Sequence, residues 1–172
     1  STLGLAVFLS GCASQPELQQ AVAETRLPIA QIERGVLIWL PEHVLFETGK
    51  AEFRAEPFQG IFREAQQAGL HLTIHAGEWG GAPNVREAIE VLDADRIGHG
   101  VRVMEDTETV ALARERKVTF EVCITSNHQT GVVESLPAHP LNKMIAAGLD
   151  ITLVTDDPSI SKITLTDAYR LT

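Results

Sequence analysis

The sequence predicts an α/β fold made of parallel β-α units, and three observations lead to this prediction. From residue 58 onward, segments with helical periodicity alternate with short apolar runs. Polar residues follow directly on several of these runs, as they do at the carboxyl ends of parallel strands. The chain has 172 residues, which is enough for one domain with a core but short of the roughly 250 that a complete (β/α)8 barrel normally needs.

Apolar spacing and glycine breaks define the expected elements. We expect helices over residues 58–68, 84–92, 105–117 and 141–147, with Gly69 and Gly148 closing the first and the last. We expect strands over residues 70–74, 96–97, 118–122 and 151–154. The residues that follow these strands are expected to meet at one mouth: 75–78, His99, 126–127 and 156–157.

The first 54 residues have a different character. The apolar run that ends in Leu9-Ser10-Gly11-Cys12 resembles a bacterial lipoprotein signal, which implies a lipid anchor at Cys12; an amino-terminal strand is the alternative. Residues 14–34 are expected to form a linker with some helical tendency, and residues 39–53 resemble the start of a peptidoglycan-binding domain of outer-membrane lipoproteins. The expected domains are therefore residues 1–12, 13–54 and 55–172.

The composition narrows the classes of partner. The formal net charge of -9 and the absence of a Lys/Arg cluster argue against nucleic-acid binding, because a phosphate backbone would be repelled. A small neutral or cationic substrate is more compatible with this charge. The two cysteines, Cys12 and Cys123, lie far apart, so we expect no disulfide framework, and Cys123 is expected to be a packed small hydrophobe.

Two histidine motifs carry the first chemical signal. In His75-Ala76-Gly77-Glu78, an imidazole and a carboxylate flank a glycine turn, as a metal ligand and a proton shuttle would. Taken alone, a histidine at a strand end, such as His75, is more often a structural histidine. In Arg96-Ile97-Gly98-His99-Gly100, His99 lies between glycines that allow close approach of a ligand, although it could also cap a glycine-rich turn.

A pair of carboxylates carries the second signal. Thr155-Asp156-Asp157-Pro158 follows an expected strand, where neighbouring side chains point in different directions, so one aspartate can face a metal and the other a substrate. The alternative is a turn in which an aspartate caps a helix that begins near Ser159.

Together the motifs resemble the second half of the adenosine deaminase family. The resemblance begins at about residue 56 and rests on five segments in this order: His75-Ala76-Gly77-Glu78, Arg96-Ile97-Gly98-His99-Gly100, residues 121–127, His139-Pro140-Leu141 and Thr155-Asp156-Asp157-Pro158. It implies that residues 55–172 form strands five to eight of a (β/α)8 barrel, preceded by an unrelated segment.

The resemblance also implies the roles of the site residues. His75 and Asp156 would be ligands of Zn2+, and Glu78 would protonate a purine ring nitrogen. His99 would either orient or deprotonate the attacking water, and Asp157 would hold the purine through another ring nitrogen. The implied reaction is the zinc-dependent hydrolytic deamination of adenosine, a purine nucleoside, to inosine and ammonia.

The sequence departs from the family in two respects. A His-x-His pair and a glycine contact from the family's first half are missing, so His75 and Asp156 would be two ligands where catalytic zinc sites have three or more. We therefore expect impaired turnover by this chain, and abundant inosine production would contradict that expectation. A partial barrel would also expose strand edges and an apolar helix face, which predicts self-association.

Several alternatives remain open. Gly98 weakly favours adenosine, but adenine or AMP could be the substrate; the cytidine deaminase signature is missing. A different class of function would be a lipid-anchored, peptidoglycan-associated envelope protein with an inert deaminase-like part. The expected location is the cytoplasm if the deaminase part decides it, and the membrane or periplasm if the motif at Cys12 is processed.

Overall fold

The structure is a computed structural model, and it describes residues 5–10, 29–32, 35–40 and 59–172. The chain divides into two compact units, one of residues Ser1–Ile74 with Glu87–Asp95 and one of residues His75–Arg86 with Arg96–Thr172. Every residue of the candidate site belongs to the second unit. Among the helices of the described ranges, none has the length and apolar character needed to cross a bilayer.

The first unit contains an antiparallel arrangement of strands. Its elements are β1 (Leu5–Ser10), β2 (Ile29–Ile32), β3 (Gly35–Leu40), the helix α3 (Gln59–Gln67) and most of β4 (His71–Ala76). The strand order is β2-β3-β1-β4, with Val7 opposite Ile38 and Phe8 opposite Thr73. The expected helix over residues 58–68 is confirmed, and Gly69 follows it with a φ of +80° that favours glycine.

The structure bears on two expectations for the amino-terminal part. Residues 5–10 form a strand, which is the alternative to a signal segment, because a short apolar run can meet the pattern of either. Residues 29–32 also form a strand where we expect a linker; two β-branched residues, Ile29 and Ile32, favour it. Cys12 and residues 41–58, including the boundary at 55 and most of the segment 39–53, lie outside the described residues.

The second unit is built on parallel strands, as expected. Strands β5 (Arg96–His99), β6 (Thr119–Val122) and β7 (Asp150–Leu153) pair in parallel, with Ile97 opposite Phe120 and Phe120 opposite Ile151. At the end of β4, the Ala76 carbonyl accepts a hydrogen bond of 3.0 Å from the Gly100 amide. The parallel α/β prediction is thereby confirmed, and the numbering of these strands within a barrel stays a prediction.

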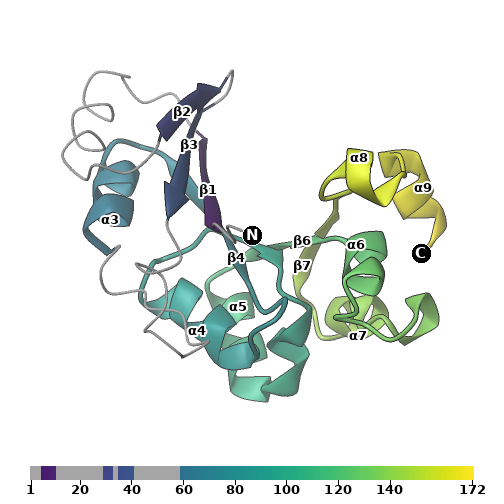
Figure 1. The fold of residues 1–172 in the computed structure, drawn as a ribbon. Coiled ribbons are helices and arrows are strands. Elements are labelled where there is room, and N and C mark those ends of the chain that lie inside the picture. Colours follow the sequence, from purple (N-terminus) through teal and green to yellow (C-terminus); the bar gives the residue numbers. More distant parts are fainter. Residues whose placement is uncertain (1–4, 11–28, 33–34, 41–58) are drawn as a thin grey trace, which may run out of the picture. The chain divides into compact units, whose positions relative to one another are not determined.

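Helices connect and flank these strands (Figure 1). They are α4 (Ala82–Glu90), α5 (Thr107–Glu115), α6 (Ile124–Gln129), α7 (Leu141–Ala146), α8 (Pro158–Ser161) and α9 (Leu165–Arg170), with 3-10 turns at Val101–Glu105 and Leu136–Ala138. Helices α4, α5 and α7 were expected, and each lies within two residues of its expected start. Helix α8 is the helix near Ser159 that the sequence offered as an alternative. Helices α6 and α9 were not expected, and α6 is the one that matters for the site.

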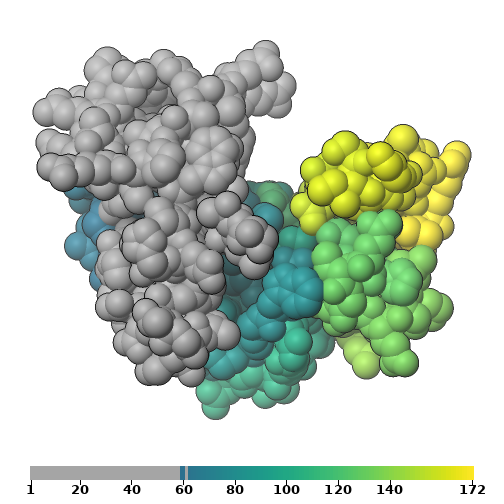
Figure 2. Space-filling view, viewed as in Figure 1, coloured from purple at the N-terminus to yellow at the C-terminus, as the bar shows by residue number. Residues whose placement is uncertain are grey.

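The core of the second unit is apolar. Its buried side chains include Ile97, Val103, Ala113, Phe120, Val122, Ile124 and Met144, all at most 3% exposed. Large apolar side chains of α8 and α9 are exposed instead, namely Ile160, Leu165 and Tyr169. Figure 2 shows these two helices, in yellow, at the surface of the molecule. Self-association through exposed apolar surface stays a prediction.

Candidate active site

His99 is the central residue of the candidate site. It is the last residue of β5 and is 1% exposed. Its φ is +62°, in the left-handed region, which histidine tolerates better than most residues. This conformation turns the chain at the strand end, and the glycines on either side leave room for the turn.

Three other predicted site residues surround His99. Its Nε2 atom lies 3.5 Å from Oε2 of Glu78 and 3.9 Å from Oδ2 of Asp156. The rings of His75 and His99 meet edge to face, with centroids 4.9 Å apart and an interplanar angle of 85°. The structure therefore brings together four of the five site residues that the sequence predicts.

A serine on α6 holds Asp156. The hydroxyl of Ser126 donates a hydrogen bond of 2.7 Å to Oδ2 of Asp156. The backbone of Asp156 also has a positive φ, +60°, so the chain turns there directly after β7. The position of this carboxylate thus depends on a helix that the sequence did not predict and on an unusual backbone conformation.

Among the described residues, two overlapping sets of donor atoms could hold a metal ion. One set is His75, Glu78 and His99, the other is His99, Cys123 and Asp156, and the donor atoms of each set lie within 4.8 Å of one another. Imidazole, carboxylate and sulfur are the donors that zinc prefers, so the residues present fit this ion. The two ligands implied by the sequence, His75 and Asp156, stand in different sets that share His99.

Burial shifts the pKa values of two side chains in the site. Burial, with a smaller contribution from the negative charge of Asp156, raises the pKa of Glu78 from 4.5 to about 7. Burial lowers the pKa of His99 from 6.5 to about 4, with a smaller contribution from His75. Near neutral pH the site therefore holds a neutral imidazole beside a carboxyl group that can gain or lose a proton.

Cys123 is buried, at 4% exposure, as a packed small hydrophobe should be. Burial and the nearby charges of Asp156 and Glu78 raise the pKa of its thiol far above the ordinary value, so the thiol stays protonated without a metal. The thiol also belongs to a donor set with His99 and Asp156.

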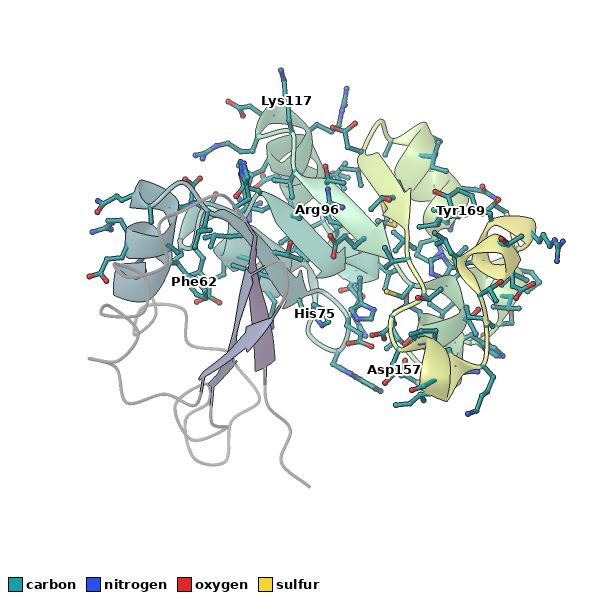
Figure 3. All side chains as sticks on the ribbon, turned by 90° about the horizontal axis from the view of Figure 1, so that it is seen from above. Phe62, His75, Arg96, Lys117, Asp157 and Tyr169 are labelled. Carbon is teal, nitrogen blue, oxygen red and sulfur yellow. The ribbon has the colours of Figure 1, made fainter. Side chains whose placement is uncertain are left out.

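Asp157 stands apart from the other predicted residues. It caps α8, because its Oδ1 atom accepts hydrogen bonds from the amides of Ser159 and Ile160 at 2.8 and 3.2 Å. These bonds lower the pKa of its carboxyl group, and the Ser159 side chain contributes most. Figure 3 labels Asp157 at the start of this helix and His75 at the end of β4. The capping role is the alternative that the sequence left open, and purine binding by Asp157 stays a prediction.

Gly98 makes room for the His75 ring. A Cβ atom on Gly98 would lie 2.3 Å from Cδ2 of His75, far inside van der Waals contact. Because His75 is exposed, its ring can move away at little cost to the fold. The glycine is therefore required for the position of the imidazole rather than for folding.

We expect Gly98→Ala to weaken zinc binding by roughly ten- to hundredfold, the effect typical of residues that position metal ligands. The melting temperature should change little. Zinc affinity measured against a competing chelator, alongside a thermal melt, checks this expectation. Gly60→Ala is the matched control, since nothing lies within 4 Å of that Cβ position. Unchanged zinc affinity in Gly98→Ala would show that His75 does not bind the metal from this position.

The structure adds residues that sequence reasoning did not assign to the site. Asn127 on α6 contacts His99, and His139 contacts Asn127. Residues 126–127 and His139 belong to motifs that carry the family resemblance, but their spacing does not reveal which atoms they contact. A polar pair directly after a strand was the available signal, and it indicated only that these residues lie near the mouth.

Parallel β-α units that carry histidines and carboxylates at their strand ends are typical of metal-dependent enzymes. A family model described as adenosine deaminase matches residues 44–172, well over half of the chain. The chain belongs to the adenosine deaminase family. The comparisons lend no support to the lipoprotein and peptidoglycan-binding resemblance of the first 54 residues, part of which the family match overlaps.

Individual relatives agree with the family match. The chain is 41% identical over 118 residues to an adenosine deaminase of Edwardsiella ictaluri, covering 69% of this chain and 35% of that protein. It resembles the crystal structure of an adenine deaminase from Arthrobacter aurescens with a TM-score of 0.66 and 36% identity, over 73% of this chain and 37% of the other. An amidohydrolase from Burkholderia ambifaria with bound zinc matches with a TM-score of 0.61 and 30% identity, over 71% and 35%.

The chain thus spans about a third of the length of the curated relatives it matches. The likeness supports a deaminase-like fold for the matched part of the chain. We therefore state the activity and the substrate only as proposals.

Proposed function

We propose that the site serves the zinc-dependent hydrolytic deamination of a 6-aminopurine, with adenosine as substrate and inosine and ammonia as products. The observation that carries this proposal is the meeting of two carboxylates, Glu78 and Asp156, at Nε2 of the buried His99. Deamination needs a positioned water, a proton for the ring and a proton for the leaving amine.

Glu78 has the properties of the proton donor. With a pKa of about 7, a large fraction of its carboxyl groups is protonated near neutral pH, whereas an ordinary glutamate would be ionised. Its side chain is 17% exposed, which leaves it accessible to a small substrate. Glu78 would give its proton to a ring nitrogen of the purine and make the amine-bearing carbon more electrophilic.

His75 and Asp156 would hold the zinc ion, while Glu78 and His99 of the same two donor sets would act on the ring proton and on the attacking water. When bound, zinc supplies a lowered pKa for a water molecule, which makes the water a nucleophile near neutral pH. Ser126 keeps the Asp156 carboxylate in place through one oxygen. Asp157 would bind the purine through a ring nitrogen while it caps α8.

The substrate could also be adenine, and one observation favours this second candidate. The solved adenine deaminase of Arthrobacter aurescens shares 36% identity with this chain over the matched region. The curated adenosine deaminases share about as much, for example 41% in the Edwardsiella ictaluri protein. Parallel assays with adenosine and adenine distinguish the two, since only the nucleoside yields inosine.

Zinc binding is the first test. We expect the chain to take up zinc on dialysis, and His75→Ala and Asp156→Ala each to reduce the bound zinc to near background. His71→Ala is the control, because His71 is an exposed histidine at the start of the same strand and pairs with Asp95 outside the site. Zinc uptake unaffected by both site variants would contradict the proposed ligands.

Turnover is the second test. With zinc supplied, we expect slow formation of inosine that disappears on addition of a chelator and in Glu78→Gln. Product analysis by chromatography over a range of protein concentrations measures this. Inosine formation that persists in Glu78→Gln would rule out Glu78 as the proton donor, and no inosine above background would contradict the proposed activity for this chain.

A further inference from the structure

A line of hydrogen bonds runs behind His99, on the side away from Glu78 and Asp156. The backbone amide of Leu141 lies 3.1 Å from Nδ1 of His139. Nε2 of His139 lies 3.3 Å from Oδ1 of Asn127, and Nδ2 of Asn127 lies 3.1 Å from Nδ1 of His99. The reaction proposed above uses neither Asn127 nor His139.

The Leu141 amide sets the direction of this line. A backbone N–H can only donate, so Nδ1 of His139 has to accept and cannot carry a proton. Burial lowers the pKa of His139 to about 4, so the ring is neutral near neutral pH. A neutral ring keeps one proton, which must therefore be on Nε2, facing Asn127.

The amide of Asn127 has one orientation that suits both neighbours. Its oxygen accepts from Nε2–H of His139, and its NH2 group then faces His99. The flipped amide would set the NH2 group against the proton of His139, a contact between two donors. Asn127 is 0% exposed, so water cannot relieve such a contact.

The NH2 group of Asn127 in turn fixes His99. It can only donate, so Nδ1 of His99 accepts and carries no proton, which leaves the ring proton on Nε2. The opposite side of the ring agrees with this assignment. Nε2 faces the carboxylates of Glu78 and Asp156, both of which accept hydrogen bonds when ionised.

We propose that Asn127 and His139 are positioning residues that hold His99 in the tautomer with its proton on Nε2. Resting on the proposed function, this assigns His99 the role of orienting the attacking water by donating a hydrogen bond to its oxygen. Nε2 has no lone pair in this tautomer, so His99 does not take the water's proton there. The sequence left open whether His99 orients or deprotonates the attacking water, and this assignment selects orientation.

Nitrogen-15 NMR of the metal-free, substrate-free chain at neutral pH tests the proposal directly. The two ring nitrogens of each histidine give distinct shifts according to which one carries the proton, and loss of signals in His99→Gln and His139→Gln assigns the rings. We expect Nδ1 of both His99 and His139 to be unprotonated and Nε2 of both to be protonated. A proton on Nδ1 of His99 in the unsubstituted chain would overturn the proposal.

Asn127→Asp makes the test sharper. A carboxylate only accepts, so it can still bind His139 but now requires a proton on Nδ1 of His99. We expect the His99 signals to change to those of a ring protonated at Nδ1, while those of His139 stay the same. Asn142→Asp introduces the same charge at an exposed residue of α7 and should leave both rings unchanged. An unchanged His99 tautomer in folded Asn127→Asp would overturn the proposal.

His139→Ala provides a second variant if the buried carboxylate prevents folding. Without the Nε2–H donor, the Asn127 amide can turn over and accept from His99, so we expect both His99 tautomers to be populated. A single Nε2–H tautomer in this variant would show that His139 does not set the direction. These NMR measurements need neither zinc nor substrate. The expected tautomer of His99 can therefore be found when no deaminase activity is detected, and it can be contradicted when activity is detected.

Discussion

Replacing Gly100 with alanine is expected to lower the free energy of unfolding by about 3 kcal/mol, from two separate causes. The φ of Gly100 is +62°, where an L-residue costs about 1–2 kcal/mol. A Cβ atom there would lie 2.3 Å from Cδ1 of Phe120, and Phe120 is 0% exposed, so its ring cannot move aside cheaply. Overpacking of this kind costs about 1–3 kcal/mol.

Gly131→Ala separates the two causes. Gly131 has a φ of +78° but nothing lies within 4 Å of its Cβ position, so this variant should show only the backbone cost. Urea denaturation of the two variants, followed by circular dichroism, gives the comparison. Equal destabilisation of both would mean that the contact with Phe120 costs nothing, and that the turn after His99 is looser than the structure indicates.

Glu78→Gln is expected to stabilise the metal-free chain at high pH by about 3 kcal/mol, which is the difference between pKa values of 4.5 and about 7. In the folded chain Glu78 binds its proton more tightly than in the unfolded chain. The stabilising effect of that proton is complete below pH 4.5 and is lost as the pH rises through about 7. Glutamine has no ionisation cost, so the variant should gain stability only where the glutamate would be charged.

The pH dependence is the readout for this second prediction. The difference in unfolding free energy between Glu78→Gln and the unsubstituted chain should be near zero at about pH 4 and should reach a plateau at about pH 9. His99 titrates in both proteins, so its contribution cancels to first order. Glu134→Gln, at an exposed position, is the control. A difference that does not vary with pH would mean that Glu78 has an ordinary pKa.

The parallel β-α part of the fold could be predicted because its strands and longer helices have clear periodicity. Helix α6 could not be predicted, because it has only six residues and its N-cap residue, Cys123, makes no side-chain capping hydrogen bond. Its helical form depends on the packing of Ile124 in the core, which a local pattern does not show. The amino-terminal strand β1 was ambiguous for a related reason, because an apolar run of this length suits either a strand or a signal segment.

The candidate site could be predicted as a set of residue types but not as a set of contacts. His75, Glu78, His99 and Asp156 stand at or just after strands, so the topology alone places them near one another. The partners of Asn127 could not be predicted, because it touches His99, 28 residues earlier, and His139, 12 residues later. Such contacts depend on how β5, α6 and the turn before α7 pack together.

The backbone conformation of His99 and Asp156 has a consequence for attempts to engineer this chain. Both have positive φ angles, +62° and +60°, that glycine would adopt without strain. Selection for thermal tolerance alone would therefore favour glycine at Asp156, whose side chain is partly exposed, whereas glycine in place of the buried His99 would leave a cavity. Libraries selected for stability should keep both positions constant. Otherwise they would enrich for stable variants that lack residues of the candidate site.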